Sequence, residues 1–475
     1  MSEILKKTKN ICSIGPSTQS WENFKGLVEA GMNVARINFS HATMEERKLD
    51  ESLIKRANEE LGANIATLYD TKGPDLRTCT FEGDYIELVE GETIKLVEND
   101  LQDKGNKEKI SFNYRNIIKD LHVGSVVLLD DGFYKLVVEE ELDEDGGAVV
   151  CRIINGGTIK SRRGVCIPGI KLDVPYVSEQ DREDIKYACD MDGDYLAISF
   201  VNTAENVNEV RELCSKFGKP NMPIISKVET QYAMDNLAEI VEASDYIMIA
   251  RGDLGVETGV ENLPLYQQMM IDECHKQGKG CIMATQMMTS MKKNIRPTNA
   301  EVTDVANAVL RGCDAIMTSD ETTMGDYPVE TIKAMASICN KVEKITKYEL
   351  GNFELKGTAI HNTIAKCVTE ATRDLPIKAI IVSTATGKTA EDISSLRPDS
   401  LIYAVTPSEK VARTLSLKWG VYSKVVNAQG TEGIIEEGIK AAKEKFNLKN
   451  GDLIAIVGGY PDDEHTNFMK IEEIA

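Results

Sequence analysis

Short apolar runs recur through the first and third quarters of the chain, and each has the length of a buried strand. The eight runs are Asn10–Ile14, Asn33–Phe39, Asn64–Tyr69, Tyr195–Phe200, Pro223–Lys227, Tyr246–Ala250, Cys281–Ala284 and Ala315–Thr318. Between most of them lie stretches in which apolar residues are three or four positions apart, as in amphipathic helices. Eight strand–helix units in one run predict an α/β fold, a (β/α)8 TIM barrel.

A different pattern interrupts the barrel after its third predicted strand. Five segments alternate apolar and polar residues with a period of two, which is typical of half-buried strands. They are Tyr85–Val89, Thr93–Val97, Ser125–Leu129, Phe133–Val138 and Ala148–Ile154. We expect a small all-β domain, a β-barrel, inserted at residues 74–168 between the Gly/Pro hinges Gly73-Pro74 and Pro168-Gly169. The TIM barrel would then occupy residues 1–73 and 169–345.

A second α/β pattern begins at about residue 351. Its predicted strands are Lys378–Val382, Ile402–Val405, Leu453–Val457 and Met469–Ile474. Helical stretches lie between them. This pattern predicts a separate C-terminal α/β domain at residues 351–475.

Charge and composition narrow the function further. The chain has 475 residues and a formal net charge of −21, which argues against binding to nucleic acids or anionic membranes. Small phosphorylated substrates stay compatible if Arg and Lys gather in one pocket. No apolar run approaches the roughly 18 residues of a membrane helix, and the start lacks the apolar core of a signal peptide, so we expect a cytoplasmic protein. The 11 cysteines are expected to be reduced and mostly buried.

Polar side chains gather at the ends of six predicted barrel strands. They are Arg36, Asn38 and Ser40, Asp70 and Thr71, Lys227 and Glu229, Arg251 to Asp253, Thr285 and Gln286, and Ser319 and Glu321. Active sites of TIM barrels lie on the face formed by the carboxyl ends of the strands. The coincidence therefore predicts a site on that face.

The residue types at these ends suggest phosphate chemistry with a metal. Glu229 and Asp253 are carboxylates without a neighbouring Cys or His, a ligand type that suits Mg²⁺ or Mn²⁺. Lys227 would lie on the same side of an extended strand as Glu229, where it could stabilise a transferring phosphoryl group. Arg36 and Arg77 could bind phosphate oxygens. Solvated capping acids, a neutralising Lys and surface ion pairs would give the same pattern, so that alternative stays open.

Two further features have equally open interpretations. Gly252 would let backbone N–H groups approach an anion at a helix N-terminus, although turns need glycine anyway. Asn38, Ser40, Asp70 and Thr71 are oxygen donors with one formal charge between them. That set suits a monovalent cation or an ordinary hydrogen-bond network.

Long blocks around these residues resemble the pyruvate kinase family over essentially the whole chain. The blocks are Thr8–Ser17, Gly31–His41, Asp70–Thr78, Ile225–Glu229, Ile249–Glu257, Ala284–Met291, Pro297–Val309, Ser319–Pro328 and Ile402–Tyr422. They occur in the order of the family. The resemblance implies transfer of the phosphoryl group of phosphoenolpyruvate to ADP, giving pyruvate and ATP in the final step of glycolysis. It also implies a homotetramer, although Asn299 replaces an Arg that the family usually has near a subunit contact.

The resemblance implies catalytic roles for five residues. Lys227 would stabilise the phosphoryl group in flight. Glu229 and Asp253 would hold Mg²⁺. The backbone at Gly252 and Asp253 and the hydroxyl of Thr285 would bind the substrate carboxylate, and Thr285 would lie where the enolate carbon is protonated.

It also implies how phosphates and a second cation are held. Arg36 would bind phosphate, and Arg77 with a second Mg²⁺ would help to seat ADP. The inserted domain would be a lid that excludes water. A K⁺ site would consist of Asn38, Ser40, Asp70 and the Thr71 carbonyl. Asp75 keeps the negative charge that is usual in K⁺-dependent members.

A loop in the C-terminal domain is similar to the phosphate loop of the family. It consists of Ser383, Thr384, Ala385, Thr386, Gly387, Lys388 and Thr389, whose hydroxyls, amides and ammonium suit one phosphate; an ordinary strand-to-helix turn is the alternative. The partner loop Gly459–Asn467 is shortened and contains three consecutive acids, which would repel a second phosphate. We expect a sugar monophosphate effector, or none, rather than fructose 1,6-bisphosphate.

Two functional hypotheses follow. The complete set of Lys227, Glu229, Asp253 and Thr285 favours an active pyruvate kinase. A paralogue that keeps the fold but works as a regulatory or interaction subunit is the alternative, and pyruvate formation by the purified protein would distinguish them. Another phosphoenolpyruvate-using barrel, such as a lyase, would not explain the inserted and C-terminal domains.

Overall fold

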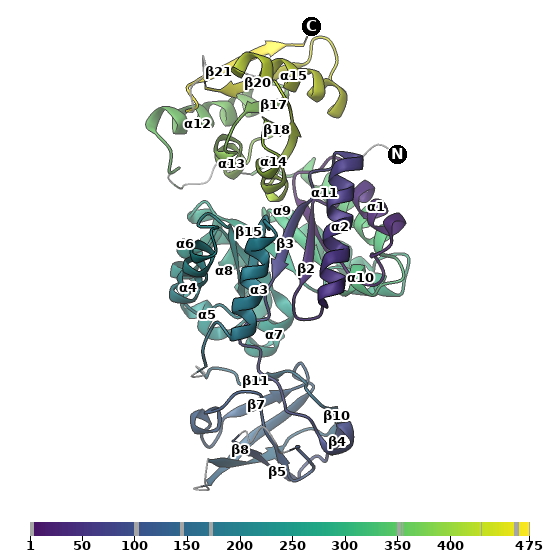
Figure 1. Cartoon of the computed structure of the whole chain (residues 1–475), viewed down its shortest axis with the longest axis vertical. Helices are drawn as coiled ribbons and strands as arrows, with labels where there is room; N and C mark the ends of the chain where they lie inside the picture. The colour runs from purple at the N-terminus through teal and green to yellow at the C-terminus, as the bar shows by residue number, and fades with distance from the viewer. Residues whose placement is uncertain are drawn as a thin grey trace.

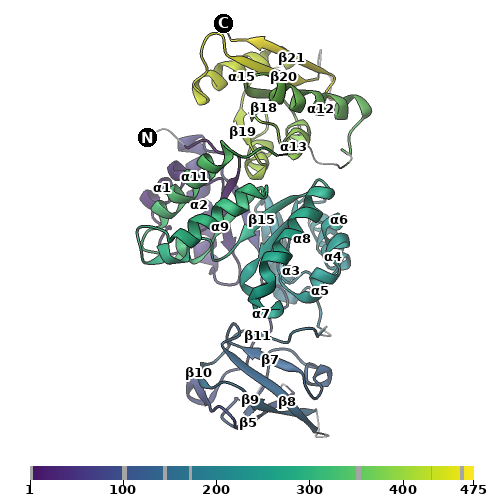
Figure 2. The same cartoon turned by 180° about the vertical axis from the view of Figure 1, so that it is seen from behind.

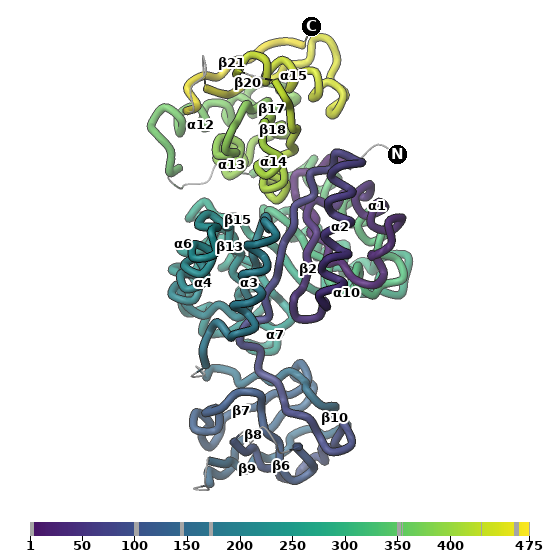
Figure 3. The backbone as a smooth tube through the Cα atoms, in the orientation of Figure 1, coloured from purple at the N-terminus to yellow at the C-terminus, as the bar shows by residue number. Residues whose placement is uncertain are grey.

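The computed structural model describes residues 4–98, 104–142, 147–170, 174–348, 353, 355–428, 430–459 and 465–474. Three bodies follow one another along its long axis, with the barrel in the middle, the insert at one end and the C-terminal domain at the other (Figures 1 and 2). The backbone tube leaves the barrel, forms the insert and returns (Figure 3). The predicted domain boundary at residue 351 lies outside the described residues, and the other boundaries stay predictions.

Eight parallel strands close the predicted barrel. They are β1 (Lys9–Ser13), β2 (Val34–Asn38), β3 (Ala66–Asp70), β12 (Tyr195–Ile198), β13 (Ile224–Val228), β14 (Tyr246–Ala250), β15 (Gly280–Ala284) and β16 (Ala315–Thr318). Their hydrogen-bonded order is β1-β16-β15-β14-β13-β12-β3-β2, closing back onto β1. Each end differs from the prediction by no more than two residues, because strands buried on both faces are near-continuous apolar runs.

Helices surround these strands and bury their apolar faces against them. They are α1 (Trp21–Ala30), α2 (Met44–Leu61), α3 (Glu179–Asp190), α4 (Ala204–Lys216), α5 (Gln231–Asp235), α6 (Leu237–Ala243), α7 (Arg251–Thr258), α8 (Leu263–Lys276), α9 (Asn299–Leu310), α10 (Asp320–Thr323) and α11 (Pro328–Glu343). Side-chain caps set several starts: Thr43 and Glu46 form a capping box at α2, and Thr298 and Glu301 form one at α9. The main hydrophobic core lies between helices and strands.

The insert is an all-β domain with its own core. Its strands are β4 (Tyr85–Leu88), β5 (Thr93–Val97), β6 (Lys109–Ile110), β7 (Val126–Leu129), β8 (Tyr134–Leu142), β9 (Ala148–Ile153), β10 (Gly157–Lys160) and β11 (Val165–Cys166). They form a six-stranded sheet, β11-β7-β8-β9-β5-β6, and a two-stranded sheet, β10-β4. Residues 76–79 join the two edges of the six-stranded sheet: Val165 N donates to Leu76 O beside β11, and Cys79 N donates to Ser111 O beside β6. The expected β-barrel stays a prediction. The prediction missed β6, β10 and β11, because strands this short show little alternation of apolar and polar residues.

The C-terminal domain is the predicted α/β domain. Its elements are α12 (Ala359–Asp374), β17 (Ile377–Ser383), α13 (Lys388–Ser395), β18 (Leu401–Thr406), α14 (Glu409–Thr414), β19 (Val421–Val425), α15 (Gly430–Lys445), β20 (Leu453–Gly458) and β21 (Phe468–Glu473). The sheet order is β19-β18-β17-β20-β21, with β21 antiparallel to β20. The prediction missed the edge strand β19, whose sequence includes polar Ser423 and Lys424.

Ion pairs join the C-terminal domain to the amino-terminal ends of the barrel strands, opposite the insert. Arg397 and Asp314, which precedes β16, form a bidentate pair with both N–O distances at 3.0 Å. Arg413 lies 3.1 Å from Asp194, which precedes β12. Both acids are almost fully buried, where ion pairs hold a fixed geometry. The barrel therefore presents its carboxyl-terminal face to the insert alone.

Candidate active site

A cleft of about 750 Å³ lies between the carboxyl ends of the barrel strands and the insert. The barrel contributes Glu229 and Asp253 to its lining, and the insert and its hinge contribute Asp75, Arg77 and Asp131. Residues that are far apart in the sequence thus face one space. The cleft occupies the face on which barrel active sites occur.

Lys227 lies among anionic and hydroxyl groups beneath this cleft. Its Nζ is 3.2 Å from Glu229 Oε1 and 3.5 Å from Asp70 Oδ1, and it donates a hydrogen bond of 2.7 Å to Ser199 Oγ. Burial alone would lower the pKa of Lys227, but Asp70 and Glu229 raise it above its ordinary value. The side chain therefore stays positively charged although only 13% of its surface is exposed.

Glu229 and Asp253 offer oxygen ligands on two neighbouring strand ends. Glu229 follows β13, is 1% exposed, and accepts a 2.6 Å hydrogen bond from Phe200 N. Burial raises the pKa of Glu229, and the Asp253 charge raises it further. Asp253 lies in the first turn of α7 and forms no ion pair or hydrogen bond through its side chain within the described ranges. Two carboxylates that repel each other across a cleft fit a divalent cation such as Mg²⁺.

The backbone is strained where β15 ends. Thr285 and Gln286 have φ values of 64° and 53°, a region that L-residues with side chains adopt rarely. Gly252 N donates a 3.0 Å hydrogen bond to Thr285 Oγ1. Arg251 Nε donates to the Thr285 carbonyl at 3.1 Å, and its Nη1 donates to Asp304 at 2.7 Å. These contacts hold the Thr285 hydroxyl against the start of α7, and strain of this kind concentrates at functional sites.

Arg36 and Asp70 form a buried ion pair on adjacent strands. Arg36 Nε lies 2.7 Å from Asp70 Oδ2, and Arg36 Nη1 donates to Ser13 Oγ at 2.7 Å. Burial would raise the pKa of Asp70, but Lys227 and Arg36 together lower it. Asp70 is therefore a carboxylate shared by two cations, and Arg36 keeps N–H groups for another acceptor.

The four oxygen donors predicted to bind K⁺ lie at the ends of β2 and β3. Asn38 is paired with Asp70 in the sheet register. Ser40 N donates to Asn38 Oδ1 at 3.1 Å, and the Thr71 carbonyl accepts a 2.7 Å hydrogen bond from Ser199 Oγ. The fold thus brings the four oxygen donors together. It also gives them hydrogen bonds within the protein, as the alternative of an ordinary hydrogen-bond network requires.

Arg77 extends the positive charge to the insert side of the cleft. Its Nε lies 2.5 Å from Asp75 Oδ2, and its backbone N donates to Asn113 Oδ1 at 2.7 Å. Burial lowers the pKa of His41, and the nearby Arg77 and Arg36 lower it further. The charges of Arg36 and Arg77 therefore both act on His41, which lines the cleft, although only Arg77 of the two arginines lines it.

Sequence reasoning missed two polar groups of the site. Ser199 directly follows β12 and contacts Lys227, and it would have been found by applying the strand-end rule to that strand as well. Asp131 lies in the β7–β8 turn, where Asp130, Asp131 and Gly132 all have positive φ. Burial raises the pKa of Asp131, as does the charge of Asp253. No local signal connects these two acids, because only the fold brings the turn to the barrel.

The predicted phosphate loop lies in the C-terminal domain, far from the cleft. Ser383 ends β17, and Thr384 Oγ1 accepts a 2.9 Å hydrogen bond from Gly387 N. Thr386 Oγ1 accepts one from Lys388 N at 3.4 Å, and the Thr389 and Thr466 hydroxyls are 2.6 Å apart. The Lys388 ammonium lies 2.7 Å from Asp392. Tyr460–Glu464 of the acidic partner loop lie outside the described residues.

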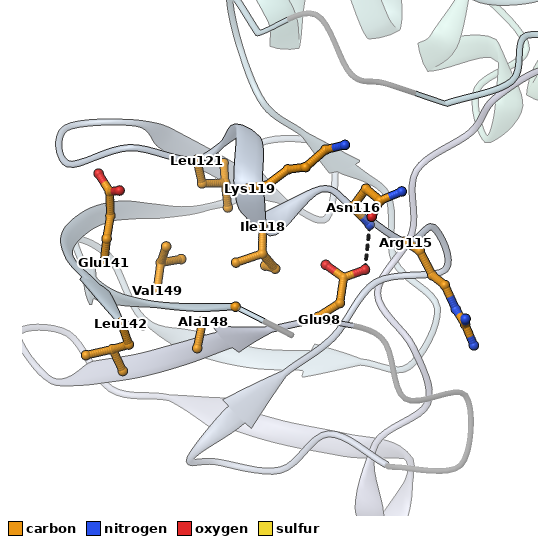
Figure 4. A pocket seen from close by; sticks show the side chains of 11 residues that line it. Glu98, Arg115, Asn116, Ile118, Lys119, Leu121, Glu141, Leu142, Ala148 and Val149 are labelled. Carbon is orange, nitrogen blue, oxygen red and sulfur yellow. Dashed lines mark hydrogen bonds between the residues drawn. The ribbon is translucent and has the colours of Figure 1, made fainter. Parts of the chain in front are cut away.

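A separate cavity of about 530 Å³ lies within the insert (Figure 4). Its floor is apolar, with Ile118, Leu121 and Val149, and Glu98 and Arg115 lie at its rim. Asn116 N donates to Glu98 at 2.5 Å. None of the predicted site residues is among those that line it.

Cysteines, membrane segments and metal clusters add little to the site. All 11 cysteines are free thiols, and most are buried, as predicted. No helix in the described part of the chain is long and apolar enough to cross a membrane. The same residues contain no group of three or more His, Cys, Asp or Glu side chains that could hold a metal ion, so a metal here would also need substrate or water oxygens.

Fold and cleft together define a (β/α)8-barrel enzyme with a capping β domain and a cationic, oxygen-rich centre. Residues 5–332 match the family described as pyruvate kinase, barrel domain, and residues 362–472 match pyruvate kinase, alpha/beta domain. The chain belongs to the pyruvate kinase family. Members of this family are phosphotransferases that convert phosphoenolpyruvate to pyruvate.

Individual relatives cover nearly the whole chain. The pyruvate kinases of Staphylococcus haemolyticus (strain JCSC1435) and Staphylococcus aureus (strain USA300) are each 41% identical to it over 473 residues, covering 98% of this chain and 80% of the relative. A crystal structure of a pyruvate kinase from Cryptosporidium parvum superposes with a TM-score of 0.90 at 36% identity, covering 98% of this chain and 96% of the other.

Proposed function

We propose that Lys227 is the central catalytic residue of this phosphotransferase. The observation that carries the proposal is its position: a part-buried ammonium between Asp70 and Glu229, of which Glu229 lines the cleft. Phosphoenolpyruvate would bind with its phosphoryl group toward Lys227 and Arg36. Charge that develops on the phosphoryl oxygens during transfer would then meet preorganised cations at low dielectric.

Glu229 and Asp253 would hold Mg²⁺ or Mn²⁺, which, when bound, supplies positive charge to the phosphoryl and substrate oxygens. Arg77 would orient the phosphates of ADP at the insert side of the cleft, assisted by a second Mg²⁺. An oxygen of the ADP terminal phosphate would attack phosphorus as the bond to the enol oxygen breaks, leaving the enolate of pyruvate and ATP. The insert would exclude water from this step, since hydrolysis competes with transfer.

Thr285 would complete the reaction. Its hydroxyl accepts from Gly252 N at 3.0 Å, so its own proton can point toward the cleft. Together with the backbone of Gly252 and Asp253 it would bind the substrate carboxylate. It would also hold the water that delivers a proton to the enolate carbon, which yields the methyl group of pyruvate.

We further propose that K⁺ binds to Asn38, Ser40, Asp70 and the Thr71 carbonyl. Asp70 supports this proposal because it is ionised between two cations and lies at the junction of β2 and β3. A sugar monophosphate, or no effector, would bind the loop of Ser383 to Thr389. A cytoplasmic location and a homotetrameric assembly follow from the family resemblance alone and stay predictions.

The test combines product formation with one metal-site variant. The purified protein should form pyruvate from phosphoenolpyruvate and ADP only when Mg²⁺ or Mn²⁺ is added. Asp253→Ala should lower turnover by about two to three orders of magnitude, because transition-state charge loses its main partner. Asp235→Ala, an acid that also borders the cleft, is the matched control and should keep near wild-type turnover. Near wild-type turnover of a folded Asp253→Ala variant would refute the metal assignment, and no pyruvate under any condition would favour the regulatory paralogue.

A further inference from the structure

A cavity of about 600 Å³ lies between the barrel and the C-terminal domain, at the end of the barrel opposite the active-site cleft. Its lining includes Tyr246 at the start of β14, Gly280 at the start of β15, and Lys388 of α13. Figure 2 shows these parts of the barrel and of the C-terminal domain facing each other. The proposed reaction does not use this space, and of the predicted phosphate loop only Lys388 lines it.

The carboxylates that line the cavity are already neutralised. Asp245, Asp314, Glu391 and Asp392 each have a carboxylate oxygen within 3.2 Å of an Arg or Lys nitrogen. An acid that is held by its own cation adds little negative potential to the space in front of it. The remaining charges of the lining therefore decide the potential of the cavity.

Four further cations line it, and none of them forms an ion pair with any residue that the structure describes: Lys279, Arg311, Lys347 and Lys356. Lys279 Nζ donates only to the backbone carbonyls of Glu242 and Ser244. Burial lowers the pKa of Lys279, Asp245 opposes that shift, and the Lys356 charge lowers it again. Among the residues that the structure describes, these like charges leave the cavity positive and without a counter-ion, in a chain whose net charge is −21.

We propose that this cavity binds a small phosphate ester. The guanidinium of Arg311 can bind two phosphate oxygens at once, and the lysines add point charges. Tyr348, Phe353 and Leu355 form an apolar part of the lining that can cover the organic portion of the ester. The volume is that of a typical small-molecule site, which excludes a macromolecular polyanion.

Such a ligand would join two domains. Lys279 and Arg311 belong to the barrel, whereas Lys356 and Lys388 belong to the segment that leads into and forms the C-terminal domain. A bound dianion would also compete with Asp392 for Lys388, whose backbone lies in the predicted phosphate loop. A ligand bound in the cavity can therefore affect the predicted phosphate loop through Lys388, although the cavity is not the loop site itself.

Calorimetric titration of the full-length protein with phenyl phosphate tests the proposal, with inorganic phosphate as a second probe. Measurements near 10 mM ionic strength keep the charges effective over about 30 Å. The double variant Arg311→Gln/Lys356→Gln should weaken one binding event by at least about tenfold, as expected for the loss of charge-assisted contacts. Both residues are exposed at the cavity mouth, so the variant should fold, and its thermal midpoint without ligand checks this.

Two single variants serve as matched controls. Lys344→Gln removes an exposed lysine close to Lys347 that does not line the cavity, and Thr386→Ala alters the predicted phosphate loop; neither should change that binding event. Wild-type titration behaviour of the double variant would overturn the proposal. Loss of the same event in Thr386→Ala would assign it to the loop instead, and tighter binding of inorganic phosphate than of phenyl phosphate would overturn the assignment to an ester.

Discussion

Replacing Lys227 by methionine perturbs the proposed active site most directly. Methionine keeps an unbranched side chain of similar length and removes only the ammonium group. In the native protein that ammonium lies within 3.5 Å of Glu229 and Asp70 and donates to Ser199. The variant should therefore lose transition-state stabilisation and also leave two buried carboxylates with one cation fewer.

Both magnitudes follow from the contacts. Loss of one preorganised donor to a developing anion typically lowers turnover by about 10²–10³, or roughly 3–4 kcal/mol in activation free energy. Breaking a buried ion pair typically costs about 3–5 kcal/mol of folding stability. We expect the lower end here, because Asp70 keeps Arg36 and Glu229 keeps the Phe200 amide.

Steady-state kinetics and urea unfolding measure the two effects separately. Turnover should fall by the factor above, while the Michaelis constant for phosphoenolpyruvate changes little, as expected for an interaction made in the transition state. Lys219→Met, which removes a lysine whose ion pair with Asp192 is partly exposed, is the control and should change neither quantity appreciably. If Lys227→Met raises only the Michaelis constant, Lys227 binds substrate and does not stabilise the transferring group.

Three further predictions address cations, pH and the hinge. Activity should require K⁺, because Asp75 keeps the negative charge that the resemblance associates with K⁺ dependence; full activity in sodium-free and potassium-free buffer would contradict the site. Burial raises the pKa of Asp50 to about 7 from 3.8. Ionisation of Asp50 in the folded protein therefore lowers the free energy of unfolding progressively from about pH 4 to about pH 7, and the full cost is present above that pH. Asp50→Asn should raise the free energy of unfolding by roughly 2–4 kcal/mol at pH 8, and an equal gain at pH 4 would show another cause. Glu257 accepts from Cys166 Sγ at 2.8 Å and from Gly169 N at 3.3 Å, which ties the hinge of the insert to α7. Cys166→Ala should therefore lower turnover roughly tenfold, because the insert is misplaced, and Cys166→Ser should restore turnover. Equal activity of the two variants would show that the Cys166–Glu257 contact does not position the insert.

The fold was largely predictable because its main elements leave strong local patterns. Strand β14 was predicted to the residue, since the buried run Tyr246–Ala250 is bounded by polar residues. The edge strand β19 was missed because an edge needs less apolar sequence. Residues 76–79, which join the two edges of the sheet in the insert, were not predicted as a pairing segment, because sheet closure depends on pairings between strands and not on the pattern within each one.

The candidate site likewise combines contacts that the sequence predicted with contacts that only the fold creates. Lys227 and Glu229 were paired from a spacing of two in a strand, and their 3.2 Å contact confirms that local geometry. Ser199 joins them from the end of β12, where the strand-end rule would have placed it at the site without giving its 2.7 Å contact with Lys227. The ion pair of Lys388 with Asp392, by contrast, joins residues four positions apart in α13, which is a local contact.

By itself, the sequence determined the eight strands of the barrel and which chemistry gathers at their ends. Periodicity and residue type are local properties, so they can be read without knowing neighbours in space. Only the tertiary structure decided that Asp131 faces Asp253, that Cys166 reaches Glu257, and that unpaired cations converge on a cavity between two domains. Asp131 and Asp253 are 122 positions apart, and Cys166 and Glu257 are 91 positions apart. The packing of whole domains sets these contacts, because charge and hydrogen bonding act through space and not along the sequence.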